Sequence, residues 1–160
     1  MTKAKLPVTQ AIRVLKKSGT GYTLYPYKYE EKGGTGVAAR ELNVEEHRVI
    51  KTLVMENERG DPVLVLMHGD RQVSTKALAR ALKVKTMTPS KKEAAHKHTG
   101  YFVGGISPFG TKKPLKVYVE STIMDLPFIY INAGRKGLLA RISPEDLVKV
   151  LKPVWVNVAI

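Results

Sequence analysis

The sequence predicts an α+β fold, in which a mixed, barrel-like β-sheet is surrounded by helices. Short apolar stretches of strand length are interleaved with amphipathic helical stretches, and the alternation lacks the regular β-α-β rhythm of a parallel sheet. The chain has 160 residues, and a domain of this size buries roughly 70% of the surface that its unfolded chain exposes. We therefore expect one domain over residues 1–160.

The helices are predicted from apolar residues at helical spacing, together with start and stop signals. Gly19 can supply the left-handed stop of the first helix, Ser74 is an N-cap, and Ser143 followed by Pro144 has the favoured order of cap and proline. In chain order, the expected helices cover residues 8–17, 37–42, 74–82, 90–99, a short turn at 121–125, and a stretch that starts at 143.

The strands are predicted from apolar and β-branched stretches that are bounded by turn residues. Residues 57–61 form a hairpin turn into a buried strand, and Pro26 makes the first strand an edge strand or an irregular one. In chain order, the expected strands cover residues 22–29, 48–56, 63–67, 84–87, 115–120, 127–131, 138–142 and 154–160. Residues 132–137 combine glycines with basic side chains and are expected to form a loop.

The charge of the chain is the strongest global indication of function. The formal net charge is +13 and the sequence pI is about 9.9. Such a charge attracts polyanions, of which nucleic acid is the usual one in the cytoplasm. Basic composition alone leaves two possibilities open, a nucleic-acid-binding protein or a protein that is merely basic.

The composition also excludes several classes of protein. There are no cysteines, which excludes a thiolate nucleophile, a cysteine zinc site and a disulfide framework supplied by the chain. The apolar runs are far shorter than the roughly 20 residues of a spanning helix, and no apolar stretch of a signal peptide precedes Pro7. We expect a cytoplasmic protein with no membrane partner.

Lys51 is the most informative residue of the second predicted strand. With a period of two, Lys51 shares a face with Val49, Leu53 and Met55, and is the one charged side chain in that row. Its stem either lies along an outer surface, or its ammonium group ends in a partly desolvated cleft that receives an anion or a carbonyl. The pattern leaves both interpretations open.

A glycine-rich loop covers residues 99–114. Gly104 and Gly105 allow close approach of another molecule to the main chain, and Pro108 fixes the path beyond them. Lys112 and Lys113 follow, so an ester or phosphate approaching the loop N–H groups would also meet positive charge. The alternative is that these residues only shape a tight connection.

Neither a metal site nor a protein nucleophile is predicted. No two of the four histidines have the i, i+4 spacing of a helical zinc site, and we expect all four at the surface. Ser107 precedes Pro108 and lacks the Gly-x-Ser-x-Gly elbow of a hydrolase. We therefore expect no cofactor and no metal.

Four motifs in this order resemble the YbaK/EbsC family of aminoacyl-tRNA deacylases, which is similar to the editing insertion of bacterial prolyl-tRNA synthetases. The resemblance covers nearly the whole chain and implies the YbaK/ProRS-associated domain fold. The motifs are Val49-Ile50-Lys51-Thr52-Leu53, Ser74-Thr75-Lys76-Ala77-Leu78, Thr99-Gly100-Tyr101 with Gly104-Gly105-Ile106-Ser107-Pro108-Phe109-Gly110, and Gly134-Arg135-Lys136-Gly137.

The resemblance implies a trans-editing enzyme that clears mischarged tRNA, chiefly Cys-tRNA(Pro), without a metal. The thiol of the substrate would attack its own ester carbonyl and leave as a cyclic thiolactone. Its partners would be tRNA, not DNA, and a prolyl-tRNA synthetase. Lys51 and Gly105 would be catalytic, and the substrate-binding residues would be Tyr27, Thr52, Gly104, Ile106, Ser107, Asn132 and Gly134.

Two departures from the YbaK pattern make the amino-acid preference less certain than the activity. Asn132-Ala133-Gly134 stands where YbaK-type members carry Ser-Gly-Gly, and Leu139 stands where some carry an aspartate. A deacylase for another small amino acid, such as alanine or serine, is therefore one alternative. The others are a non-catalytic RNA-binding module and, far less favoured, a nucleotide enzyme that uses the loop at residues 33–36.

Overall fold

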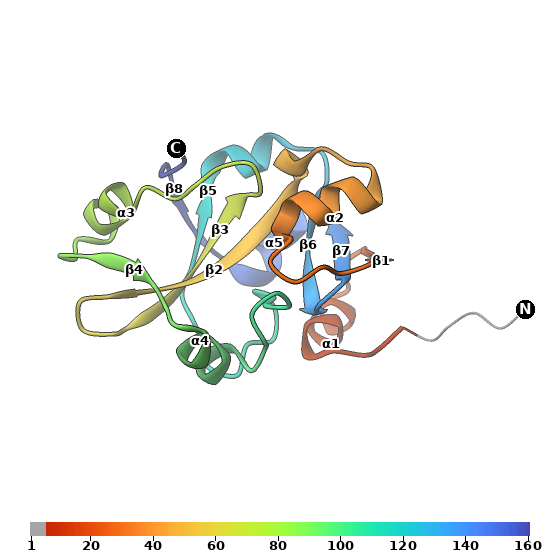
Figure 1. The fold of residues 1–160 in the computed structure, drawn as a ribbon, viewed down its shortest axis with the longest axis horizontal. Helices are drawn as coiled ribbons and strands as arrows, with labels where there is room; N and C mark the ends of the chain where they lie inside the picture. Colours follow the sequence, from red (N-terminus) through yellow and green to blue (C-terminus); the bar gives the residue numbers. More distant parts are fainter. Residues whose placement is uncertain (1–5) are drawn as a thin grey trace, which may run out of the picture.

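The computed structural model describes residues 6–160, so residues 1–5 of the expected domain lie outside the described residues (Figure 1). Within this range the chain forms an α+β fold with one mixed sheet, as predicted. The strands are β1 (Thr23–Pro26), β2 (Val49–Asn57), β3 (Pro62–His68), β4 (Met87–Pro89), β5 (Val117–Glu120), β6 (Ile129–Arg135), β7 (Leu138–Ile142) and β8 (Val154–Val156).

Helices surround this sheet, as the sequence predicts (Figure 1). They are α1 (Gln10–Lys17), α2 (Gly34–Leu42), α3 (Thr75–Leu82), α4 (Lys92–Thr99) and α5 (Pro144–Leu151), with short 3-10 helices η1 (Glu46–Arg48) and η2 (Ser121–Asp125). The predicted caps at Ser74 and Ser143 are confirmed, because their hydroxyls accept hydrogen bonds from the third backbone N–H that follows each. A cap at Ser90, predicted from Glu93 three residues later, is wrong, because α4 starts after Lys91 and the Ser90 hydroxyl has no partner among the described residues. None of the helices in residues 6–160 is long and apolar enough to cross a bilayer.

β2 is the central strand of the sheet (Figure 1). It pairs antiparallel with β3 over seven register pairs, from Ile50 to Glu56. Its other edge pairs parallel with β6 at Val49 and Ile50, and antiparallel with β4 from Met55 onward. Between these two partners, within the described part of the chain, residues 51–54 pair with no strand on that edge. The sheet is therefore split beside the middle of β2.

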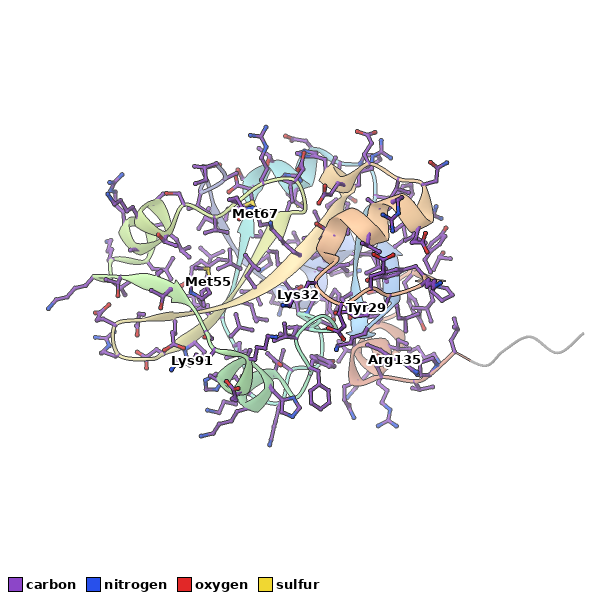
Figure 2. The ribbon with its side chains drawn as sticks, in the orientation of Figure 1. Tyr29, Lys32, Met55, Met67, Lys91 and Arg135 are labelled. Atoms are coloured by element: carbon purple, nitrogen blue, oxygen red, sulfur yellow. The ribbon has the colours of Figure 1, made fainter. Side chains whose placement is uncertain are left out.

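The apolar side chains of β2 alternate between the two faces of the sheet, as the period of two predicts, and Val49 packs in a separate small core with α2 and β7. Ile50 and Val54 enter the core that also contains the apolar faces of α1 and α5. Met55 enters the core that packs beneath α3, together with Met67 of β3, and both methionines are labelled in Figure 2. Because both faces of β2 are buried, its register is fixed. A shift of one residue would move each side chain to the opposite face of the sheet.

Several elements differ in length or position from the prediction. Among the helices, α2 starts three residues earlier than expected, and α1 and α4 start two residues later. β1 and β8 are shorter than expected, and β4 starts three residues later than expected. β6 is longer, because it continues through a bulge between Asn132 and Arg135 and keeps pairing with β7. The loop predicted at residues 132–137 is therefore mostly a bulged strand, and the reversal falls at Lys136 and Gly137. A bulge of this kind cannot be distinguished from a loop by glycine content.

The prediction that all four histidines lie at the surface is wrong for His68. His68 ends β3 and is only 1% exposed. Its Nδ1–H donates to the His47 carbonyl at 2.8 Å, and its Nε2 accepts from the Thr122 hydroxyl at 2.8 Å. Its ring also stacks on that of His47, with 3.7 Å between centroids. Both nitrogens are satisfied when the ring is neutral, and the neutral form avoids the cost of burying a charge.

We predict that acidification lowers the free energy of unfolding more in the parent protein than in His68→Gln. Burial lowers the pKa of His68 below its ordinary value of 6.5, so the unfolded chain takes up a proton there before the folded chain does. The contribution of neutral His68 is therefore complete above pH 6.5 and is lost as the pH falls through the folded-state pKa.

Urea unfolding of both proteins between about pH 7.5 and about pH 5 measures this difference. The groups that face His68, namely the His47 ring that stacks on it and the Asp70 and Glu120 carboxylates, are present in both proteins. If the free energy of unfolding changed with pH in the same way in both proteins, His68 would not take up a proton on unfolding.

Candidate functional site

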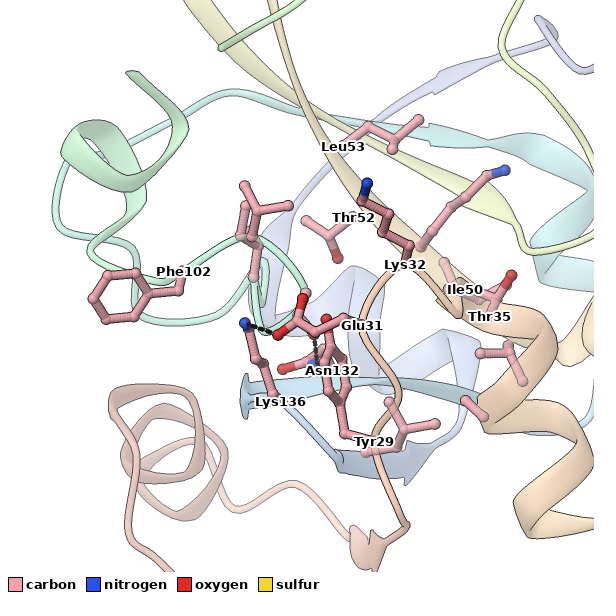
Figure 3. Close-up of a pocket in the computed structure, with 18 of the residues that line it drawn as sticks. Tyr29, Glu31, Lys32, Thr35, Ile50, Thr52, Leu53, Phe102, Asn132 and Lys136 are labelled. Atoms are coloured by element: carbon pink, nitrogen blue, oxygen red, sulfur yellow. Dashed lines mark hydrogen bonds and ion pairs between the residues drawn. The ribbon is translucent and has the colours of Figure 1, made fainter. Parts of the chain in front are cut away.

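A cavity of about 550 Å³ lies beside the unpaired edge of β2 (Figure 3). One wall is residues 49–53 of β2, and the opposite wall is residues 102–106 of the glycine-rich loop. The segment at residues 27–32 and the start of α2 close a third side, and α4 contributes Lys92 and His96. The cavity therefore occupies the place where a further strand would otherwise continue the sheet.

Lys51 lies in this cavity and is half-buried. The structure thus supports the cleft interpretation over the outer-surface one. Burial lowers the pKa of Lys51, and the carboxylates of Glu46 and Asp70 partly oppose this by favouring the charged form. An ammonium group with reduced hydration interacts more strongly with a developing negative charge than an exposed one does.

Thr52 presents an unsatisfied hydroxyl in the cavity wall. Its Oγ1 is buried and has no hydrogen-bond partner among residues 6–160. A buried hydroxyl without a partner costs about 1–3 kcal/mol. A ligand group with a matching donor or acceptor would remove this cost, so Thr52 is a candidate for direct contact with a substrate.

The glycine-rich loop approaches its neighbours closely and uses one of its N–H groups internally. Gly104 has φ +98°, and a Cβ there would overlap the Tyr29 hydroxyl. The Gly105 N–H donates to the Phe102 carbonyl at 2.8 Å and is not free for a ligand. The N–H groups of Gly104 and Ile106 donate to no residue in the described range. The N–H groups on both sides of Gly105 are therefore unbonded within the described range.

Asn132 lines the cavity, but its side-chain amide is fully occupied by backbone groups. Its Oδ1 accepts from the N–H groups of Gly134 at 2.6 Å and Arg135 at 3.0 Å. Its Nδ2 donates to the carbonyls of Arg135 at 3.1 Å and Gly104 at 3.3 Å. Asn132 thus links the β6 bulge to the glycine-rich loop, and it is a positioning residue in this state (Figure 3).

The remaining predicted site residues separate into three groups. Tyr27 and Ile106 line the cavity with Lys51, and burial raises the pKa of Tyr27. Ser107 is fully buried and does not line the cavity, because its Oγ accepts from the Phe109 N–H at 3.2 Å and shapes the loop. The other two, Gly105 and Gly134, line a smaller adjoining cavity.

Several residues of the cavity are not singled out by the sequence patterns. Phe102 and His96 stack at its margin, with ring centroids 4.2 Å apart. Lys136 pairs with Glu31 at 2.8 Å across the opening, as Figure 3 shows. The charged lining side chains comprise four lysines and one carboxylate: Lys32, Lys51, Lys92, Lys136 and Glu31. The cavity is therefore suited to an anionic ligand.

No three His, Asp or Glu side chains in the described part of the chain gather closely enough to hold a metal ion. Besides the Glu31 carboxylate and the His96 ring, the residues that line the cavity supply the Lys51 ammonium and the Thr52 hydroxyl, and they include Gly104 and Ile106, whose N–H groups are unbonded in the described range. The ammonium, hydroxyl and N–H groups can bind a phosphate, a carbonyl oxygen or an oxyanion.

Comparison with known proteins assigns the family. Residues 31–150 match the model of the family described as "Aminoacyl-tRNA editing domain", which covers most of the chain. The chain belongs to the aminoacyl-tRNA editing domain family. This confirms the expected relationship to the YbaK/EbsC proteins, and with it the mixed α+β fold of that family.

Individual relatives of this editing domain are distant in sequence. The chain is 27% identical to "Putative Cys-tRNA(Pro)/Cys-tRNA(Cys) deacylase EbsC" of Enterococcus faecalis, with 89% of this chain and 87% of that protein covered. It is also 27% identical to a "Proline--tRNA ligase" of Limosilactobacillus reuteri, with coverage of 76% of this chain but only 23% of that protein.

A solved structure has the same fold. It is described as "Crystal structure of a putative trans-editing enzyme for prolyl tRNA synthetase", and it superposes with a TM-score of 0.83 at 20% identity. The superposition covers 96% of this chain and 99% of that one. At 20% identity, the match shows that the helices and strands of the two chains are arranged in the same way.

We predict that Asn132→Ala loosens the glycine-rich loop of the editing domain. The change removes the one side-chain hydrogen bond from Asn132 to the loop, at Gly104, and the three that hold the β6 bulge in shape, and we expect a loss of about 1–3 kcal/mol in the free energy of unfolding. Amide hydrogen exchange at residues 102–106 should accelerate. Exchange in α3, on the far side of β2, is the internal control, and unchanged exchange at residues 102–106 would contradict the linking role.

Proposed function

We propose that this protein is a trans-acting editing deacylase that clears mischarged tRNA, with Cys-tRNA(Pro) as its preferred substrate. The observation that carries the proposal is the half-buried Lys51 ammonium beside the unsatisfied Thr52 hydroxyl, in a cavity of an aminoacyl-tRNA editing domain. The name of the Enterococcus faecalis relative supports the choice of cysteine and of tRNA(Pro).

The aminoacylated 3′ end of the tRNA would enter the main cavity. Its volume of about 550 Å³ lies within the range of small-ligand sites. The ester carbonyl would lie between Lys51 and the free N–H groups of Gly104 and Ile106, two residues that line the same cavity. Thr52 would hydrogen-bond the amino acid or the terminal ribose, and Tyr27 would contribute to the wall of the site.

Cleavage would use the thiol of the substrate as the nucleophile. The cysteinyl sulfur forms a bond to its own carbonyl carbon, the ester bond to the ribose oxygen breaks, and the thiol proton ends on that oxygen. Lys51 and the loop N–H groups would stabilise the negative charge that develops on the carbonyl oxygen. The chain would contribute orientation and charge, which suits a sequence without cysteine.

Two of the predicted roles are revised in this proposal. Gly105 would act through the turn that its N–H closes with Phe102. Ser107 would act through the loop shape that it maintains. We also propose a prolyl-tRNA synthetase as a partner, on the similarity to the ligase, and the cytoplasm as the place of action.

Replacement of Lys51 distinguishes a deacylase from a non-catalytic RNA-binding module. We predict that Lys51→Ala lowers the rate of deacylation about 10²- to 10³-fold, because no other ammonium group lies on that face of β2. The folded state should persist, since Lys51 belongs to neither apolar core.

The measurement is release of amino acid from a panel of mischarged tRNAs, with melting temperature as the test of folding. Lys85→Ala is the matched control, because Lys85 is exposed and lies outside the cavity. Activity of Lys51→Ala within threefold of the parent would remove Lys51 from the mechanism.

The substrate-assisted route predicts a clear order of substrates. Cys-tRNA(Pro) should be cleared much faster than Ser-tRNA or Ala-tRNA, because a thiol with a pKa near 8.5 is partly ionised at neutral pH and a serine hydroxyl is not. Mass spectrometry of the quenched reaction should detect a thiolactone. Equal rates on Cys-tRNA and Ser-tRNA, without a thiolactone, would indicate attack by water and would make His96, which lines the cavity, the first base to test.

A further inference from the structure

A second, smaller cavity of about 330 Å³ adjoins the main one. The two cavities share Phe102 and Lys136, and the smaller one is completed by Gly105, Gly134 and Arg135. A ligand longer than one aminoacyl nucleoside could therefore extend from one cavity into the other. None of the roles proposed above uses this second space.

Phe102 is an exposed aromatic side chain that is nevertheless held in place. Its ring is 69% exposed, so it contributes little to a core. It stacks on the His96 ring at 4.2 Å with 14° between the planes. The Nδ1–H of His96 donates to the Tyr101 carbonyl at 3.1 Å, which fixes the imidazole in turn. Figure 3 shows the Phe102 ring at the outer margin of the site.

One face of this ring is covered by His96, and the high exposure of Phe102 leaves the other available. An exposed aromatic ring that is held by its neighbours suits the stacking of a nucleic-acid base, because every base has a flat π-face. Stacking of this kind requires no particular base sequence. The ring therefore fits a contact with RNA better than a role in stability.

Arg135 supplies an available cation beside this ring. It is exposed and forms no ion pair within residues 6–160, whereas its neighbour Lys136 is paired with Glu31 and lies over the Tyr29 ring at 5.3 Å. Two hydrogen bonds with the Asn132 side chain, one donated by its Nδ2 and one accepted by its Oδ1, hold the Arg135 backbone. A guanidinium group binds a phosphate through two parallel N–H donors.

We propose that Phe102 and Arg135 form a second nucleotide subsite, which binds the nucleotide immediately before the terminal adenosine of the RNA. Its base would stack on the open face of Phe102, and its phosphate would bind Arg135. The inference rests on the proposed function in one respect, that the terminal aminoacyl nucleoside occupies the main cavity. The subsite itself can be tested without turnover.

The probe is an RNA acceptor-stem hairpin that ends in CCA and carries 2-aminopurine in place of the penultimate cytosine. The emission of 2-aminopurine falls when it stacks on a ring. The parent protein and Phe102→Trp should quench it on binding. Phe102→Leu keeps an apolar side chain without a π-face, and it should lose the quenching and raise Kd about 5- to 100-fold.

Arg135→Gln tests the phosphate contact separately. It should raise Kd, reduce the slope of log K against log salt by about 0.7, and leave the quenching at saturation intact. Arg80→Gln is the matched control, because Arg80 is an exposed arginine on α3, outside both cavities. Melting temperatures should be unchanged in all four variants, since the replaced side chains are exposed or, for the control, remote.

Quenching and affinity that are the same in Phe102→Leu and the parent would overturn the subsite, and so would failure of the parent to bind the hairpin. Deacylation of mischarged tRNA, assayed in parallel, separates this result from the proposed function. Phe102-dependent quenching without any deacylation would refute the deacylase and support the subsite. Deacylation together with RNA binding that does not depend on Phe102 would support the deacylase and refute the subsite.

Discussion

The split in the sheet beside β2 is the feature on which the rest of the site depends. β2 is fully paired with β3 on one edge, but its other edge passes from β6 to β4 and leaves residues 51–54 without a strand partner. Lys51 and Thr52 lie on this stretch, and their side chains, which leave opposite faces of β2, both line the cavity. A long, well-buried strand thereby carries polar groups into a cavity without a break in its own pairing to β3.

The bulge of β6 completes the site from the opposite side. Between Asn132 and Arg135 the strand departs from regular pairing with β7, and this turns the Asn132 amide toward the glycine-rich loop. The same short segment therefore fixes the Gly104 backbone and supports Arg135 and Lys136 at the rim. One irregularity in one strand connects the ester-binding and phosphate-binding parts of the proposed site.

Local patterns account for much of the fold and for the position of Lys51. The period of two in β2 and the caps at Ser74 and Ser143 depend on neighbouring residues only, and the structure confirms them. What the patterns miss depends on partners far along the chain. The burial of His68 requires Thr122, and the occupied amide of Asn132 requires Gly104. Glycine content located the loop correctly, but it could not show that the Gly105 N–H is already bonded to Phe102.

The two walls of the cavity are held with unequal strength. Lys51 and Thr52 belong to a strand with seven register pairs to β3, whereas residues 102–106 belong to no strand or helix of the described chain. Strongly paired strands open rarely, and weakly tethered loops open often. When a ligand binds, the conformational entropy that the protein loses therefore comes almost entirely from ordering the loop at residues 102–106. Selectivity among similar ligands would then be governed by how much freedom the loop loses, while the charge on β2 acts equally on all of them.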